Sequence, residues 1–292
     1  MQGVFTALVT PFNSDGSLDL AAFKKILLDQ KDAGVQGVIP CGTTGEGSTL
    51  TLEEKKTLIT LAIETMRGSQ TKVIAGTGSN DTAATIELSR WASKQKVAGV
   101  LVVTPYYNKP SQAGLEMHFK AVADAVDCEV MLYNVPGRTG VALTAETIVR
   151  LARHERIRSI KEASGNVAFT SEILDQLGAA GVTMDILSGD DATFLPLLTV
   201  GAVGVVSVAS NLFPRAMVAL YKKRELELHR RFYPLFRDLF IDSNPGPIKY
   251  AMARHGLGAM RLRAPLTLMV EANQQILEAS LERCGIKAGA KL

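Results

Sequence analysis

Two side chains, Lys161 and Tyr133, have the types and positions that covalent carbonyl chemistry requires. Lys161 ends the run IRSIK at residues 157–161, and alternation along a strand places Ile157 and Lys161 on one face. An inward lysine is uncommon because its charge is costly to bury, so a strand-end lysine that reaches solvent is the alternative. Held in an apolar interior, the amine could lose its proton and form a Schiff base with a carbonyl carbon.

The charge of Lys161 decides whether this chemistry is possible. At the ordinary lysine pKa, roughly one amine in a few thousand is neutral at pH 7. A pKa of about 8 would raise the neutral fraction to roughly one in ten. The environment must then disfavour the charged amine by about 3 kcal/mol. An apolar barrel interior could supply that cost through desolvation.

Tyr133 ends a similar run, EVMLYN at residues 129–134, and lies 28 residues before Lys161, which is one β-α unit. Adjacent strands that end in an inward tyrosine and an inward lysine would place a phenol beside the imine for proton transfer. A core tyrosine whose hydroxyl is satisfied locally is the alternative. Arg138, in a PGRTG turn, could hold a substrate carboxylate or form a structural ion pair.

Residues 42–49, GTTGEGST, nearly match the phosphate-binding loop GxxxxGK[ST], but Ser48 stands where the lysine belongs. This difference disfavours a nucleotide, whereas the hydroxyls and free N–H groups of such a loop suit a carboxylate. The pair Tyr106-Tyr107 is compatible with a core position, a stacking platform or a subunit interface.

Several classes of protein are disfavoured. The four histidines lie outside the strand-end motifs without HExxH or HxxxH spacing, and Asp190 and Asp191 suit helix capping, so no metal site is predicted. A net charge of +3 does not point to nucleic acid. The apolar run at 195–209 is too short and interrupted to span a membrane. Three widely spaced cysteines and the lack of a basic signal region predict a cytoplasmic protein.

The elements that must position these residues alternate regularly along the chain. Eight short β-branched runs begin 20 to 36 residues apart, close to the length of a β-helix-β unit. The predicted strands are Val4–Val9, Gly37–Cys41, Val73–Gly76, Gly99–Thr104, Glu129–Asn134, Ile157–Lys161, Met184–Ser188 and Gly204–Val208. Predicted helices between them include Leu20–Ala33, Leu52–Met66, Thr82–Ser93 and Leu115–Val126.

This alternation predicts an α/β fold, a (β/α)8 TIM barrel over residues 1–213 with C-terminal helices packed on it over residues 214–292. Thr51 and Glu54 form a predicted capping box at the start of the second helix. An open doubly wound sheet is the rival, but TPFN at residues 10–13 is not the glycine-rich turn it would need.

Six strand-end motifs together resemble one family. They are GTTGE at 42–46, GTGSN at 76–80, TPYYNKPSQ at 104–112, YNVPGRTG at 133–140, KEASGN at 161–166 and SGDD at 188–191. The order and spacing resemble the dihydrodipicolinate synthase family of the pyruvate-dependent class I aldolase and lyase superfamily, from Thr6 to about Pro265.

The resemblance implies a reaction, a set of site residues and partners. Pyruvate would form an imine with Lys161 and condense with L-aspartate 4-semialdehyde to 4-hydroxy-tetrahydrodipicolinate, in lysine and diaminopimelate biosynthesis, without a cofactor. The implied catalytic residues are Lys161, Tyr133, Thr43 and Tyr107, the last from a neighbouring subunit of a homo-oligomer, at least a dimer and by family a tetramer. The implied substrate-binding residues are Thr44 and the backbone of Val206 for pyruvate, and Arg138 for the semialdehyde.

The sequence departs from lysine-inhibited members of that family, which carry a glutamate where Ala84 stands and histidines where Leu52 and Lys55 stand. We therefore expect weak or absent feedback inhibition by lysine. Two other functions stay open from the sequence. One is a sister aldolase acting on N-acetylneuraminate or a 2-keto-3-deoxy sugar acid, and the other is a non-catalytic barrel that binds a small carboxylate.

Overall fold

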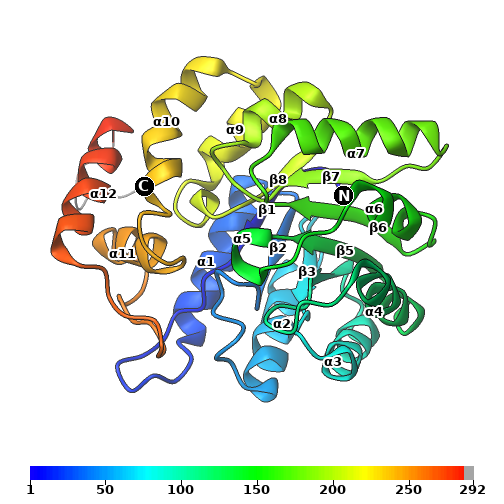
Figure 1. The fold of residues 1–292 in the computed structure, drawn as a ribbon. Coiled ribbons are helices and arrows are strands. Elements are labelled where there is room, and N and C mark those ends of the chain that lie inside the picture. Colours follow the sequence, from blue (N-terminus) through cyan, green and yellow to red (C-terminus); the bar gives the residue numbers. More distant parts are fainter. Residues whose placement is uncertain (286–292) are drawn as a thin grey trace. The chain divides into compact units, whose positions relative to one another are not determined.

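A computed structural model of the chain describes residues 1–285. Within these residues eight parallel strands follow one another around a closed barrel in chain order (Figure 1). The strands are β1 (Gly3–Ala7), β2 (Gly37–Ile39), β3 (Lys72–Gly76), β4 (Gly99–Val103), β5 (Glu129–Asn134), β6 (Ile157–Glu162), β7 (Asp185–Ser188) and β8 (Gly204–Ser207). The predicted (β/α)8 TIM barrel with further C-terminal helices is therefore confirmed.

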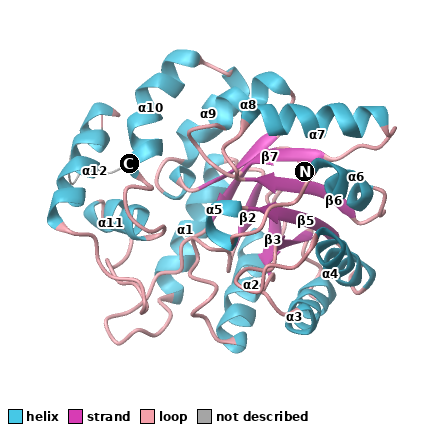
Figure 2. Ribbon diagram, viewed as in Figure 1, coloured by secondary structure: helices cyan, strands magenta, loops and turns pink. Residues whose placement is uncertain are grey.

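The helices alternate with the strands and continue beyond the last of them (Figure 2). They are α1 (Leu20–Ala33), α2 (Leu52–Met66), α3 (Thr82–Lys94), α4 (Gln112–Asp124), α5 (Pro136–Thr139), α6 (Ala145–Ala152), α7 (Val167–Ala179), α8 (Phe194–Val200), the 3₁₀ turn η1 (Ala209–Asn211), α9 (Pro214–Lys223), α10 (Leu226–Asp238), α11 (Gly246–Arg254) and α12 (Glu271–Arg283).

Local sequence signals set the helix starts. The capping box of α2 is confirmed: the Glu54 N–H donates to Thr51 Oγ1, and the Thr51 N–H donates to Glu54 Oε2. Ser111 caps α4, which therefore begins at Gln112, three residues before the predicted start.

The chain divides into two compact units. The first comprises Met1–Gly3 and Lys72–Val206, and the second comprises Val4–Thr71 and Ser207–Leu292, described as far as residue 285. The predicted boundary between barrel and helical extension, after residue 213, stays a prediction, although α9 begins at Pro214. Residues 286–292 of the predicted extension lie outside the described residues.

In the first unit, strands β3 to β7 pair in parallel, with one register shift between Val130 and Met131 where β5 pairs with β6. Val103 of β4 pairs with Tyr133 of β5, and Tyr133 pairs with Lys161 of β6. Lys161 in turn pairs with Leu187 of β7. The register therefore aligns the carboxyl ends of these strands, where a TIM barrel carries its active site.

In the second unit, side-chain contacts tie the C-terminal helices to one another. Asp238 at the end of α10 accepts a hydrogen bond from Ser280 of α12, and Tyr250 of α11 donates to Glu278 of α12 over 2.8 Å. Phe232 and Phe236 on α10 pack with tilted rings whose centroids lie 6.0 Å apart. None of the helices within residues 1–285 combines the length and the apolar character needed to cross a bilayer.

Candidate active site

Lys161 and Tyr133 lie beside each other at the ends of β6 and β5. Each side chain is only 5% exposed, and Lys161 Nζ lies 4.1 Å from the centroid of the Tyr133 ring. The register explains this contact, because Tyr133 and Lys161 are direct partners across the two strands. The predicted placement of a buried amine beside a phenol is confirmed, and a solvent-facing Lys161 is excluded.

Gly189 and Asp190, which follow β7, complete the surroundings of the lysine. A side chain at Gly189 would place its Cβ 2.5 Å from Ala163 Cβ and 3.1 Å from Lys161 Cε, so only glycine leaves room for the lysine stem. Burial raises the pKa of Asp190, while the Ala192 N–H and the charge of Lys161 act in the opposite direction. No role for Gly189 was predicted from the sequence.

Arg138 lies on α5, a single helical turn that directly follows β5. Its side chain is exposed and, among residues 1–285, it forms no ion pair. Thr139 next to it is buried and accepts a hydrogen bond from Thr104, which follows β4. The turn that carries Arg138 is therefore attached to the loop after β4.

The loop after β4 presents Tyr107 outward. Tyr107 is 88% exposed, and its backbone has a φ of 73°, a left-handed conformation that few non-glycine residues adopt. Its neighbour Asn108 anchors the loop by donating to the Asn80 carbonyl over 2.9 Å. Of the three interpretations of the tyrosine pair, a core position is wrong for Tyr107. Val206, by contrast, is fully buried in β8.

Thr43 and Thr44 belong to the second unit, in the tight loop that follows β2. Thr44 is buried, and its Oγ1 accepts a hydrogen bond from Asn244 Nδ2 over 2.9 Å. Gly47 allows the loop to fold back on Cys41, because a Cβ there would lie 2.2 Å from the Cys41 carbonyl oxygen. Asn244 is separated from Thr44 by 200 positions, and no signal in the sequence pointed to it.

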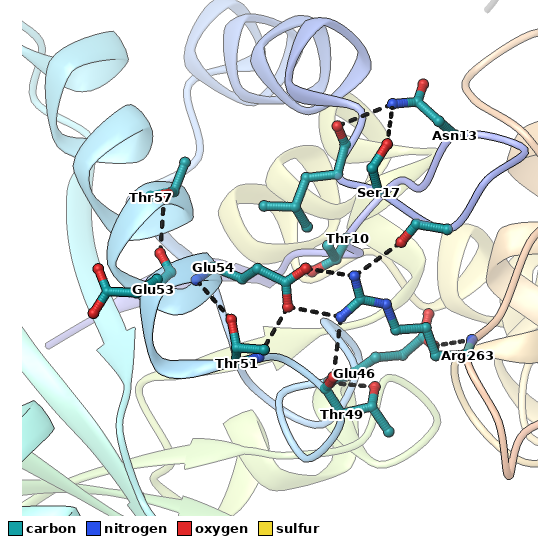
Figure 3. A network of polar contacts seen from close by, with 12 residues as sticks. Thr10, Asn13, Ser17, Glu46, Thr49, Thr51, Glu53, Glu54, Thr57 and Arg263 are labelled. Carbon is teal, nitrogen blue, oxygen red and sulfur yellow. Dashed lines mark hydrogen bonds and ion pairs between the residues drawn. The ribbon is translucent and has the colours of Figure 1, made fainter.

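A partly buried polar network holds the end of this loop (Figure 3). The Glu46 carboxylate forms an ion pair with Lys249 of α11 and accepts the Arg263 N–H over 2.9 Å. The Arg263 guanidinium pairs with Glu54 of α2 and donates to the Thr49 carbonyl. The loop containing Thr43 and Thr44 is thus fastened by residues more than 200 positions away.

Residues 1–284 match the model of the dihydrodipicolinate synthetase family. The chain is 48% identical over 277 residues to the 4-hydroxy-tetrahydrodipicolinate synthase of Leptospira biflexa serovar Patoc, covering 92% of each chain. It is similar in structure to the 4-hydroxy-tetrahydrodipicolinate synthase of Methylacidiphilum fumariolicum SolV, with a TM-score of 0.93, 44% identity and coverage of 98% of this chain and 96% of that one.

The fold is also similar to a solved complex. The chloride-inhibited dihydrodipicolinate synthase of Acinetobacter baumannii, complexed with pyruvate, has a TM-score of 0.93 and 39% identity, with coverage of 98% of this chain and 99% of that one. The resemblance inferred from the six motifs is confirmed by these likenesses. The chain belongs to the dihydrodipicolinate synthetase family.

Proposed function

We propose that this protein condenses pyruvate with L-aspartate 4-semialdehyde to give 4-hydroxy-tetrahydrodipicolinate, in lysine and diaminopimelate biosynthesis. Family membership and the names of relatives at 41–48% identity support this reaction. The observation that carries the chemistry is the buried Lys161 amine, 4.1 Å from the Tyr133 ring centroid. An amine in that position can act as the nucleophile of a class I lyase.

The reaction proceeds through a Schiff base on Lys161. The lysine nitrogen bonds to the carbonyl carbon of pyruvate, water leaves, and loss of a methyl proton converts the imine to an enamine. The enamine carbon attacks the aldehyde carbon of the semialdehyde, whose oxygen takes up a proton. The semialdehyde amine then attacks the imine carbon, displaces Lys161 and closes the ring. Tyr133 is the group that carries protons at the imine.

The other site residues are proposed from family membership. Thr43 and Tyr107 take part in proton transfer with Tyr133, while Thr44 and the backbone of Val206 bind the pyruvate carboxylate. Arg138 binds the carboxylate of the semialdehyde, for which its exposed guanidinium has the required bidentate geometry.

Tyr107 also supports a proposal about assembly. A side chain that is 88% exposed cannot act inside its own subunit in this conformation, so we propose that it reaches the site of a second copy. The protein would then be at least a dimer, and the family suggests a tetramer. The lysine itself supplies the electron sink, so the reaction as proposed uses no cofactor and no metal. The three cysteines are free thiols, which suits the proposed cytoplasmic location.

Borohydride trapping tests the proposed function. Incubation with pyruvate and borohydride should add one reduced pyruvyl group, located at Lys161 by peptide mass analysis, and the Lys161→Met variant should gain none. Lys120→Met is the control, because it removes a half-exposed lysine of α4 that pairs with Glu116, and it should trap pyruvate like the wild type. An unmodified wild-type protein would contradict the proposal and favour a non-catalytic carboxylate-binding barrel.

The aldehyde partner separates the synthase from its sister aldolases. Once pyruvate has been trapped on Lys161, each aldehyde is supplied in turn. Condensation should occur with aspartate semialdehyde and not with the sugar aldehydes that N-acetylneuraminate or 2-keto-3-deoxy sugar acid aldolases use. Turnover with a sugar aldehyde alone would assign the chain to that sister activity.

A further inference from the structure

A second pair of polar residues lies directly after Tyr133 and Lys161. Asn134 and Glu162 are the next register partners along β5 and β6, and strand alternation turns their side chains to the opposite face from Tyr133 and Lys161. Both are fully buried, and Asn134 Nδ2 donates a hydrogen bond to Glu162 Oε2 over 2.7 Å. We call these two residues the Asn134–Glu162 pair.

The remaining polar atoms of the pair hold two neighbouring backbone segments. Asn134 Oδ1 accepts the Leu143 N–H over 3.0 Å, and Glu162 Oε1 accepts the Ser164 N–H over 2.6 Å. Leu143 follows the turn that carries Arg138, and Ser164 follows the end of β6. The pair therefore joins the ends of two strands and the return from α5.

The chemistry of the Asn134–Glu162 pair suits a role in positioning the strand ends better than a role in stabilising the fold. Glu162 forms no ion pair among the residues that the structure describes, so its carboxylate depends on the two hydrogen-bond donors. Burying such a group is costly, and apolar residues of similar volume would fill the space at a lower cost. A directional hydrogen bond, in contrast, fixes one register and one orientation.

We propose that Asn134 and Glu162 are positioning residues for the reaction at Lys161. They hold the ends of β5 and β6 in the register that places the lysine amine against the Tyr133 ring, and they fix the segment that returns from Arg138. This inference rests on the proposed function. A displacement of about 1 Å between reacting groups can lower a rate by about a hundredfold, so small changes in the pair should be measurable in kcat.

An exchange of hydrogen-bond roles tests the proposal. In Glu162→Gln, an NH2 group replaces one of the two acceptor oxygens. This NH2 group must face a donor, either the Asn134 amide or the Ser164 N–H, so one hydrogen bond is lost. In Asn134→Asp, two carboxylates face each other. In the double variant Asn134→Asp/Glu162→Gln, the aspartate accepts from Leu143 and from the glutamine amide, and the glutamine oxygen accepts from Ser164. All three hydrogen bonds are regained, with the central one reversed.

We expect each single variant to lose about tenfold or more in kcat and in the rate of borohydride trapping, because Glu162→Gln loses one hydrogen bond and Asn134→Asp sets two carboxylates against each other. The double variant should recover to within about threefold of the wild type. All proteins are compared well below their melting temperatures. Asp238→Asn is the matched control: it alters another buried, hydrogen-bonded carboxylate, on α10, and should lower stability while leaving kcat unchanged.

Two results would overturn the proposal. In the first, the single variants are less stable but keep wild-type kcat and trapping rates, which would make the pair purely structural. In the second, the folded double variant is as slow as the worse single variant. If one single variant does not fold, the other and the double variant still give the comparison. A wild-type protein that traps no pyruvate would instead refute the proposed function, independently of the pair.

Discussion

Replacing Lys249 with methionine should destabilise the protein strongly, because Lys249 neutralises a buried carboxylate. The Lys249 side chain is 3% exposed and that of Glu46 is 0% exposed. The lysine ammonium contacts Glu46 Oε1, donates to the Arg261 carbonyl over 2.8 Å and lies 4.3 Å from the centroid of the Phe12 ring. Burial lowers the pKa of Lys249, and the charge of Glu46 opposes that effect.

The expected size of the effect follows from this burial. Methionine fills most of the lysine volume but leaves Glu46 with the Arg263 N–H as a remaining donor, 2.9 Å from Oε2. Breaking a buried pair in this way costs about 3–5 kcal/mol. With an unfolding entropy of about 2.1 cal/mol/K per residue, the 292-residue chain loses about 1 °C in Tm for each 0.6 kcal/mol. The Tm of Lys249→Met should therefore fall by roughly 5–8 °C.

Thermal unfolding of four proteins tests the reasoning: wild type, Lys249→Met, Glu46→Gln and the double variant. Because the double variant leaves no unpaired charge, it should lose less stability than the sum of the single changes. Lys120→Met is the matched control, since Lys120 pairs with Glu116 but is 45% exposed and should contribute at most about 1 kcal/mol. A Lys249→Met variant no less stable than Lys120→Met, or strictly additive single changes, would refute the argument.

Three further predictions concern acid stability, regulation and substrate binding. The hydrogen bond from Arg263 lowers the pKa of Glu54 from 4.5 to about 2. The ionised Glu54 therefore stabilises the folded protein fully above pH 4.5, and this stabilisation is lost as the pH falls toward 2. The difference in urea midpoint between wild type and Arg263→Met should be largest at neutral pH and should shrink at pH 3. Added lysine at millimolar concentration should inhibit weakly or not at all, because Ala84 offers no carboxylate to the effector's ammonium, and strong inhibition would contradict this. Arg138→Leu should raise KM for the semialdehyde by tenfold or more and leave pyruvate trapping intact, whereas an unchanged KM would remove Arg138 from the site.

The regular elements were predictable because their signals are local. Periodic apolar residues and caps define α1 and α2, whose predicted bounds match the structure. The strand β5 matches at both ends as well. The end of β2 was predicted two residues too far, at Cys41 in place of Ile39, because Cys41 adopts a φ of 62° and the chain turns there. Pro40 and Gly42, which flank Cys41, are the local signals of that turn.

The contacts that support the site could not be predicted, because they join distant parts of the chain. Nothing near Thr44 in the sequence indicates that Asn244 donates to it, and nothing near Glu46 indicates Lys249. The helical form of the PGRTG turn was missed for a different reason. Four residues from Pro136 to Thr139 are too few to show a helical period.

Alternation along a strand explains why polar residues are so dense at the ends of β5 and β6. Tyr133 and Lys161 face one side, and the residues after them, Asn134 and Glu162, face the other. A motif such as YN or KE therefore contains one residue suited to chemistry and one suited to holding the strand. Strand parity, which is readable from sequence, assigns the two roles once a single inward residue is known. The number of polar residues in such motifs consequently overstates the number that can touch a substrate.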